Sequence, residues 1–113
     1  MGTHREEIYA PYGPEEAMNR VTFWLNNEGD SFRVVSKEDD RLEIKRKMPL
    51  NPDIIFRIRF TLDCVRFEGW VQGLTKDPIS SSALWGGISR RIGWESFQSL
   101  KEVLSRGVIP GQL

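Results

Sequence analysis

Residues 54–74, IIFRIRFTLDCVRFEGWVQGL, alternate apolar and charged side chains over two runs separated by one short break. Such alternation is typical of strands that are buried on one face only, because successive side chains of a strand point to opposite faces. Phe56 and Ile58 would then share one face, and Arg57 and Arg59 the other. The segment therefore predicts two neighbouring strands of a half-buried sheet, with one apolar face and one basic face.

Two further strands are predicted before this segment. Phe32 and Val34 are separated by Arg33, and the run RLEIKRK at residues 41–47 alternates again. The polar cluster at residues 36–40 fits the connection of a hairpin. Four antiparallel strands in a meander are the most economical arrangement of these segments.

One helix is predicted on each side of the meander. Pro14 suits the first position of a helix, and apolar residues from Ala17 to Trp24 recur at helical spacing, so a helix would extend to about Asn27. The same spacing returns near the end of the chain, at Phe97, Leu100, Val103 and Leu104. The predicted fold class is α+β, a two-layer arrangement of helix, four-stranded antiparallel meander and helix, with both helices on the apolar face of the sheet.

Two segments carry no sustained pattern. Residues 1–13 are polar with isolated aromatic residues, and we interpret them as a loosely ordered N-terminal arm. Residues 73–93 are rich in Ser and Gly, and we interpret them as a long loop of a length that is often functional. Residues 14–113 are therefore expected to form a single domain.

The composition sets limits on partners and compartment. The 113 residues are 39% hydrophobic, and 16 basic residues balance 16 acidic ones, so bulk charge predicts neither a nucleic-acid nor a membrane partner. The single Cys64 cannot form an internal disulfide and no secretory leader is evident, which together predict a reducing, cytoplasmic location. No apolar run approaches the roughly 20 residues that span a bilayer, so membrane contact would be peripheral.

The basic face of the predicted sheet is the main candidate site. Its solvent side would carry seven cations against two carboxylates, Glu43 and Glu68, a local excess of five on a chain with no net charge. Such a face could attract the phosphates of acidic phospholipids or an acidic protein surface. Long basic side chains are also common on exposed strands simply as solubilising groups, and this alternative stays open. The predicted anion-binding residues are Arg33, Arg41, Lys45, Lys47, Arg57, Arg59 and Arg66.

The long loop supplies a second candidate contact. Trp85, together with Arg90 and Arg91, would form an apolar tip flanked by charge. This combination suits an interfacial membrane contact or a docking site, although a tryptophan also commonly pins a loop to its own domain. Nucleic acid is a weaker candidate, because Trp70 is the one aromatic residue on the basic side, whereas RNA-binding sheets display several for base stacking.

The sequence shows no motif of an enzyme, a metal site or a cofactor site. The one histidine, His4, falls in the predicted arm, which removes the usual general base and the commonest metal ligand. Cys64 has no CxxC partner, and the acidic run at residues 38–40 lacks the ligand spacing of a calcium loop. We therefore expect a non-catalytic domain that holds no metal and no cofactor.

Five stretches of the chain carry a family resemblance. They are EEAMNRVTFWLNNEGDSFRV, RLEIKRK, IIFRIRFTL, VRFEGW and ESFQSLKEVLS, and the likeness extends over residues 14–106. In this order they resemble the opening helix, the four strands and the closing helix of the kinase-associated KA1 domain, a C-terminal module of many Ser/Thr protein kinases. Residues 73–93 depart from the family in length and content.

The resemblance implies two roles, which are the binding of anionic phospholipids through basic residues and the restraint of an attached kinase domain. With the charge pattern, it leads us to expect a regulatory binding module that recognises an acidic phospholipid membrane or a kinase catalytic domain. The alternative is a small protein-interaction or assembly domain whose basic face is merely solvated.

Overall fold

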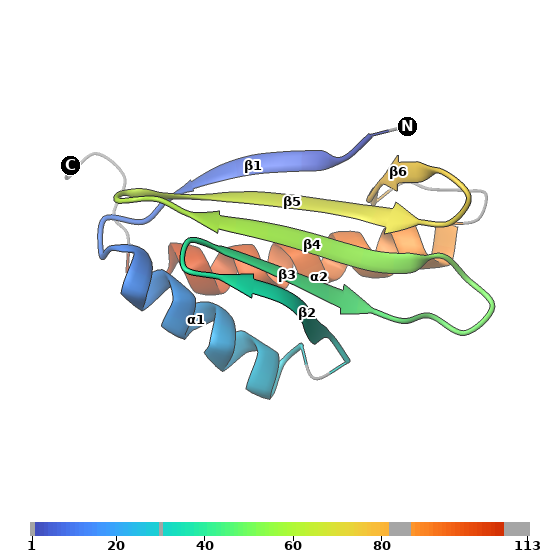
Figure 1. The fold of residues 1–113 in the computed structure, drawn as a ribbon. Coiled ribbons are helices and arrows are strands. Elements are labelled where there is room, and N and C mark those ends of the chain that lie inside the picture. Colours follow the sequence, from blue (N-terminus) through green and yellow to red (C-terminus); the bar gives the residue numbers. More distant parts are fainter. Residues whose placement is uncertain (1, 30, 82–86, 108–113) are drawn as a thin grey trace.

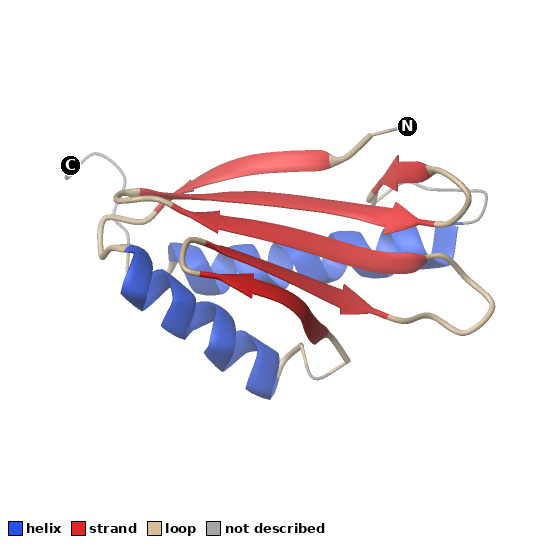
Figure 2. Ribbon diagram, in the orientation of Figure 1, coloured by secondary structure: helices blue, strands red, loops and turns tan. Residues whose placement is uncertain are grey.

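A sheet of six strands, with two helices against one of its faces, makes up the described part of the chain (Figure 1). The computed structural model describes residues 2–29, 31–81 and 87–107. The strand order is β1-β5-β4-β3-β2, every pairing is antiparallel, and β6 pairs with β5 beyond the end of β1. The fold is therefore α+β (Figure 2). In chain order the elements are β1 (His4–Tyr9), α1 (Pro14–Asn27), β2 (Arg33–Glu38), β3 (Arg41–Arg46), β4 (Asp53–Phe60), β5 (Cys64–Gln72), β6 (Lys76–Pro78) and α2 (Gly87–Ser105).

The four strands of the predicted meander, β2 to β5, are consecutive neighbours in the sheet. The register of β4 and β5 pairs Ile58 with Phe67 and Arg59 with Arg66. Apolar residues therefore meet on one face and basic residues on the other, as the alternation of the quoted segment requires.

The first helix has the predicted bounds, and a glycine allows the chain to turn sharply after it. The backbone N–H groups of Glu28 and Gly29 both donate to the carbonyl oxygen of Trp24. A Cβ atom on Gly29 would lie 2.2 Å from the Trp24 ring, so only glycine fits where the chain folds back over this side chain.

The N-terminal segment forms an edge strand, so the prediction of a loosely ordered arm was wrong for residues 4–9. β1 pairs along its whole length with β5, from His4↔Gly69 to Tyr9↔Cys64. Ile8 is its only buried side chain, which is why the sequence HREEIY shows no apolar alternation. The predicted order of helix, meander and helix is accordingly incomplete, because β1 precedes it and β6 lies between the meander and α2.

The loop predicted at residues 73–93 is also too long, because β6 occupies part of it and α2 begins at Gly87. The small residues that favoured a loop have a packing role instead. A Cβ atom on Gly93 would lie 2.6 Å from Cγ2 of Ile79 and 3.3 Å from Cγ2 of Ile54. Glycine thus permits the close approach of α2 to the sheet, a requirement that the local sequence does not reveal.

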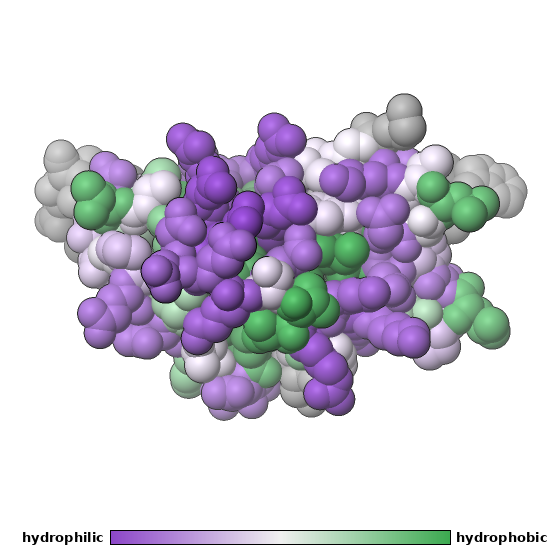
Figure 3. Space-filling model, in the orientation of Figure 1, coloured by the Kyte–Doolittle hydropathy of each residue, from purple (hydrophilic) through white to green (hydrophobic). Residues whose placement is uncertain are grey.

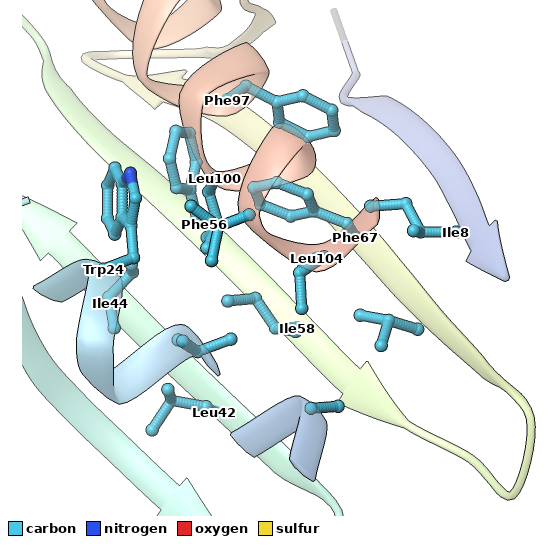
Figure 4. Packing of buried hydrophobic residues seen from close by; sticks show 14 of the residues in the cluster. Ile8, Trp24, Leu42, Ile44, Phe56, Ile58, Phe67, Phe97, Leu100 and Leu104 are labelled. Atoms are coloured by element: carbon cyan, nitrogen blue, oxygen red, sulfur yellow. The ribbon is translucent and has the colours of Figure 1, made fainter. Parts of the chain in front are cut away.

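Both helices cover the same face of the sheet, and one continuous apolar core fills the space between the layers (Figure 4). Phe67 of β5 stacks on Phe97 of α2 with 3.7 Å between the ring centroids, and Phe56 of β4 meets both rings edge-on. Burial of each ring contributes about 1.5–3 kcal/mol, and each aromatic pair about 0.5–1.5 kcal/mol more. This core fixes which face of the sheet remains open to solvent.

The two helices are also joined where α2 ends. The Tyr12 hydroxyl donates to the carbonyl oxygen of Leu104 at 2.6 Å. The Arg20 guanidinium donates to the carbonyl oxygens of Val103 and Arg106 at 3.2 and 2.7 Å. These bonds satisfy carbonyl groups that the last turn of a helix leaves without partners. Burial raises the pKa of Tyr12 despite the opposing effect of the Arg20 cation, so the hydroxyl keeps its proton for this bond.

Candidate functional site

The face of the sheet opposite the helices, here called the open face, is less basic than the sequence predicted. The strand register brings eight cations and five carboxylates onto it, so the excess is three positive charges rather than five. Polar side chains accordingly gather over the strands in Figure 3. The cations are Arg5, Arg33, Arg41, Lys45, Arg57, Arg59, Arg66 and Lys76, and the carboxylates are Glu7, Glu38, Glu43, Asp53 and Glu68.

One row of side chains across this face alternates in charge. It runs through Glu43 on β3, Arg57 on β4, Glu68 on β5 and Arg5 on β1, which are directly opposite one another in the register. The Arg57 guanidinium donates to Glu43 at 3.2 Å, and that of Arg5 to Glu68 at 3.0 Å. Opposite charges in facing positions stabilise a sheet, so this alternating row has a structural explanation.

The next row, here called the arginine row, places Arg41, Arg59 and Arg66 directly opposite one another on β3, β4 and β5. The outer two are paired with carboxylates further out, Arg41 with Glu38 at 2.8 Å and Arg66 with Glu7 at 3.1 Å. The Arg59 side chain makes no ion pair or hydrogen bond within the described residues. Like charges in facing positions destabilise a sheet, so structure alone does not explain this row.

An open hollow of about 480 Å³ lies over the two rows. A guanidinium group presents five N–H donors in a planar fork that matches carboxylate and phosphate oxygens. The hollow therefore has the donors and the room for a compact oxyanion. The arginine residues that line it are Arg5, Arg41, Arg57, Arg59 and Arg66, and Glu6, Glu7 and Glu68 share the lining.

Trp70 lies on the open face, as predicted, but it is only 3% exposed. The Lys76 ammonium lies 4.5 Å from the centroid of its ring, and the Arg57 guanidinium lies 5.1 Å from it. The indole N–H donates to Gln72 at 3.1 Å. Because neighbouring cations cover the ring, Trp70 offers no stacking surface for a nucleic-acid base.

A second group of predicted residues lies at the end of the sheet from which the β3–β4 loop and the β5–β6 loop project. Leu50 and Leu74 are fully exposed there, at 104% and 107% of the reference area, and both line one shallow depression between the loops. The beginning of α2 adjoins them, because the Ser89 hydroxyl donates to the carbonyl oxygen of Pro52 at 2.6 Å. Figure 3 shows two separate hydrophobic groups projecting at this right-hand end. This surface, here called the loop end, comprises residues 46–52, 73–78 and 87–91.

The loop end is strongly basic. It contains five cations and one carboxylate, Asp77, which leaves an excess of four positive charges. The adjoining Asp53, which lines the depression, is paired with Lys45 at 3.2 Å and does not change this excess. Ile88 adds a third exposed apolar side chain. The five cations are Arg46, Lys47, Lys76, Arg90 and Arg91.

The backbone holds Leu50 in place. Leu50 has a φ of 59°, the only positive φ of a non-glycine residue in the described part of the chain. The Asn51 side chain donates to the carbonyl oxygen of Pro49 at 2.8 Å, and the backbone N–H of Met48 donates to the Asp53 carboxylate at 3.2 Å. A leucine in this conformation costs about 1–3 kcal/mol and persists only where its surroundings enforce it.

The opposite end of the molecule is acidic. Its turns are in contact, because the N–H of Phe60 donates to the carbonyl of Asp40 and the N–H of Ala10 to that of Asp63. The loop end and these turns lie at opposite ends of the 42 Å long axis (Figure 1), so the molecule has a basic end and an acidic end although the whole chain is neutral. This surface, here called the turn end, comprises residues 13–16, 38–40 and 61–63. Two of its six carboxylates are paired with arginines just outside these ranges, Glu16 with Arg20 at 3.0 Å and Glu38 with Arg41 at 2.8 Å. The six are Glu15, Glu16, Glu38, Asp39, Asp40 and Asp63.

The predicted site residues therefore separate into groups. Arg33 lies apart on the edge strand β2, and Trp85 lies outside the described residues. Sequence reasoning missed Leu50 and Leu74, whose signal was a leucine isolated in a polar loop beside Pro or Gly. Arg41, Arg57, Arg59 and Arg66 line the hollow, whereas Lys45, Lys47, Arg90 and Arg91 lie at or beside the loop end.

A small polar cluster sits at the edge between β1 and α2. Glu6 accepts hydrogen bonds from the Lys101 ammonium at 2.5 Å and from the His4 ring at 2.8 Å. Burial alone would raise the pKa of Glu6, but the bonds to Lys101 and His4 outweigh it and lower that pKa below its ordinary value of 4.5. The His4 ring packs 5.0 Å from the rings of Trp94 and Phe97. The cluster thus anchors β1 to α2.

Among the described residues, no three His, Cys, Asp or Glu side chains are grouped as a metal site would require. Neither described helix has both the length and the apolar character needed to cross a membrane. Comparison of the chain with family models, with curated proteins and with solved structures gave no match. The resemblance to the KA1 domain therefore stays a prediction.

Proposed function

We propose that this chain is a non-catalytic binding module that attaches peripherally to acidic phospholipid membranes through its loop end. The observation that carries the proposal is the pair of fully exposed leucines, Leu50 and Leu74, on adjacent loops within a surface that has four excess positive charges. Exposed apolar side chains rimmed by cations are the combination that suits the boundary between lipid headgroups and acyl chains.

The shape of the loop end favours a bilayer over a folded protein partner. Both leucines project from loop tips, whereas an apolar docking groove would be concave and would leave them partly covered. The positive φ of Leu50 supports the same interpretation, because the loop tolerates strain in a conformation that exposes this side chain.

The magnitudes are sufficient for reversible attachment. Full burial of the two leucines would contribute about 1.5–3 kcal/mol each, and each cation near an anionic surface about 1 kcal/mol. The electrostatic share falls with ionic strength, because the screening length shortens from about 10 Å at 0.1 M salt to about 3 Å at 1 M. Binding should therefore require both anionic lipid and the leucines.

The acidic turn end would determine how the bound module is oriented on the membrane. An anionic bilayer repels its six carboxylates and attracts the five cations at the other end of the long axis. The bound module would point its turn end, and the nearby arginine row, toward the solvent.

Vesicle sedimentation tests this proposal. With phosphatidylserine–phosphatidylcholine vesicles, the double variant Leu50→Ala/Leu74→Ala should bind at least about tenfold more weakly than the parent chain, since each leucine loses roughly three methylene equivalents of transfer free energy. Leu62→Ala is the matched control, because Leu62 is 86% exposed but lies at the turn end, and its binding should be unchanged. The proposal is refuted if the parent chain does not bind these vesicles, or if Leu62→Ala loses as much affinity as the double variant.

A further inference from the structure

The arginine row lies away from the loop end, so the proposed membrane contact does not account for it. Neighbouring strands are about 4.8 Å apart, so the three side chains start within about 10 Å of one another on the same face. Arg59 stands in the middle with no described ion-pair partner, flanked by Arg41 and Arg66. One tetrahedral oxyanion above Arg59 can accept hydrogen bonds from all three guanidinium groups.

The surroundings limit the kind of anion. The turn end adjoins the row, because Glu38 and Asp40 flank Arg41 in the hairpin and the Phe60 N–H next to Arg59 donates to the Asp40 carbonyl. Four of its six carboxylates make no ion pair within the described residues, so the turn end repels an extended polyanion such as a nucleic acid or an acidic bilayer and attracts cations. The charge pattern therefore fits a single anionic group that is borne on a positively charged segment.

We propose that the arginine row binds a phosphate monoester on a basic peptide segment, with the phosphate over Arg59 and the flanking basic side chains against the carboxylates of the turn end. A phosphorylated serine or threonine carries roughly 1.5–2 negative charges and three acceptor oxygens, which suits a row of fork-shaped donors.

The existing ion pairs permit this binding. The pairs Arg41–Glu38 and Arg66–Glu7 are surface pairs with largely exposed carboxylates, and such pairs exchange partners readily. Arg57 lines the same hollow and stays paired with Glu43 in the alternating row, so it does not have to move when the phosphate binds. The phosphate thus replaces two weak carboxylate contacts with contacts to a doubly charged group.

Fluorescence anisotropy tests the proposal with labelled peptides in a phosphate-free, low-salt buffer. The probe is a peptide with one phosphoserine flanked by two lysines on each side. Its controls are the unphosphorylated peptide and a phosphopeptide with glutamates in place of the lysines. The phosphorylated basic peptide should bind at least about tenfold more tightly than either control, and Arg59→Gln should reduce its affinity about tenfold or more. Arg33→Gln, an exposed arginine on the β2 edge, should leave the affinity unchanged.

The outcomes separate this site from the membrane contact. Equal binding of the phosphorylated and unphosphorylated peptides, or no effect of Arg59→Gln, would overturn the proposal, as would no binding of the probe at all. Tighter binding of the acidic phosphopeptide would also overturn it and would indicate a site for polyanions. Leu50→Ala/Leu74→Ala should bind the peptide as the parent does, so failure of the membrane proposal leaves this test intact.

Discussion

The two central arginines of β4 should respond to the same substitution with opposite signs. Arg57 and Arg59 are two residues apart on the same strand and the same face, but Arg57 lies between Glu43 and Glu68, and Arg59 lies between two arginines. We expect Arg57→Gln to destabilise the protein and Arg59→Gln to stabilise it.

The magnitudes follow from the neighbours. Each facing pair of opposite charges contributes about 0.2–1 kcal/mol, and a like-charged pair destabilises by a similar amount. Arg59→Gln relieves two like-charged pairs, so the free energy of unfolding should rise by about 0.4–2 kcal/mol at low salt. Arg57→Gln loses two favourable pairs and the cation–π contact with Trp70, which contributes about 0.5–1 kcal/mol. The free energy of unfolding of this variant should therefore fall by about 1–3 kcal/mol.

Urea unfolding followed by tryptophan fluorescence, at 20 mM and 500 mM NaCl, measures both effects. A change of about 1 kcal/mol moves the midpoint by roughly 0.3–1 M urea, since the slope is about 1–3 kcal/mol/M for small proteins. Salt should shrink the gain in Arg59→Gln, because Arg59 and Arg66 are exposed and dissolved ions screen exposed charges. A loss of stability in Arg59→Gln, or a gain that is indifferent to salt, contradicts the interpretation of the row as electrostatically unfavourable.

Two predictions concern the contacts that hold α2. Gly93→Ala should lower the free energy of unfolding by up to about 2 kcal/mol, because overpacking against Ile79 costs about 1–3 kcal/mol and the gain in helix propensity returns roughly 1 kcal/mol. The loss should shrink in an Ile79→Ala background, and a stabilised Gly93→Ala would contradict the close packing. Burial raises the pKa of Glu6, but its bonds to Lys101 and His4 outweigh burial and lower that pKa. The ionised Glu6 therefore stabilises the fold above pH 4.5, and this contribution is lost as the pH falls through the lowered pKa. Urea midpoints between pH 3 and pH 7 should therefore depend less on pH in Glu6→Gln, and an unchanged dependence would rule out this role of Glu6.

The α+β class, the meander and the first helix were accessible from the sequence, because each depends on local periodicity. Alternation in residues 54–74 sets which side chains of β4 and β5 are buried, and Pro14 marks the beginning of α1. β1 was not accessible, because an edge strand with one buried residue has almost no pattern of its own. The beginning of α2 was hidden for a different reason, since Gly93 reflects the distance between two layers rather than a local preference.

The candidate sites, too, were predicted from the sequence only in part. The sequence indicated that Arg57, Arg59 and Arg66 would share a face, but it could not say which side chain faces which. The register decides that Arg57 is neutralised and that Arg59 is not, because a shift of two residues along one strand would exchange their neighbours.

By itself, the sequence determined a neutral chain whose strands have one apolar and one charged face, since side-chain alternation is a property of each strand alone. The tertiary structure decided how those charges combine. Strand pairing sets the arginine row beside the alternating row, and the common direction of the loops places five cations at the loop end and six carboxylates at the turn end. Electrostatic interaction depends on distance in space, which pairing and packing fix and which separation along the chain does not.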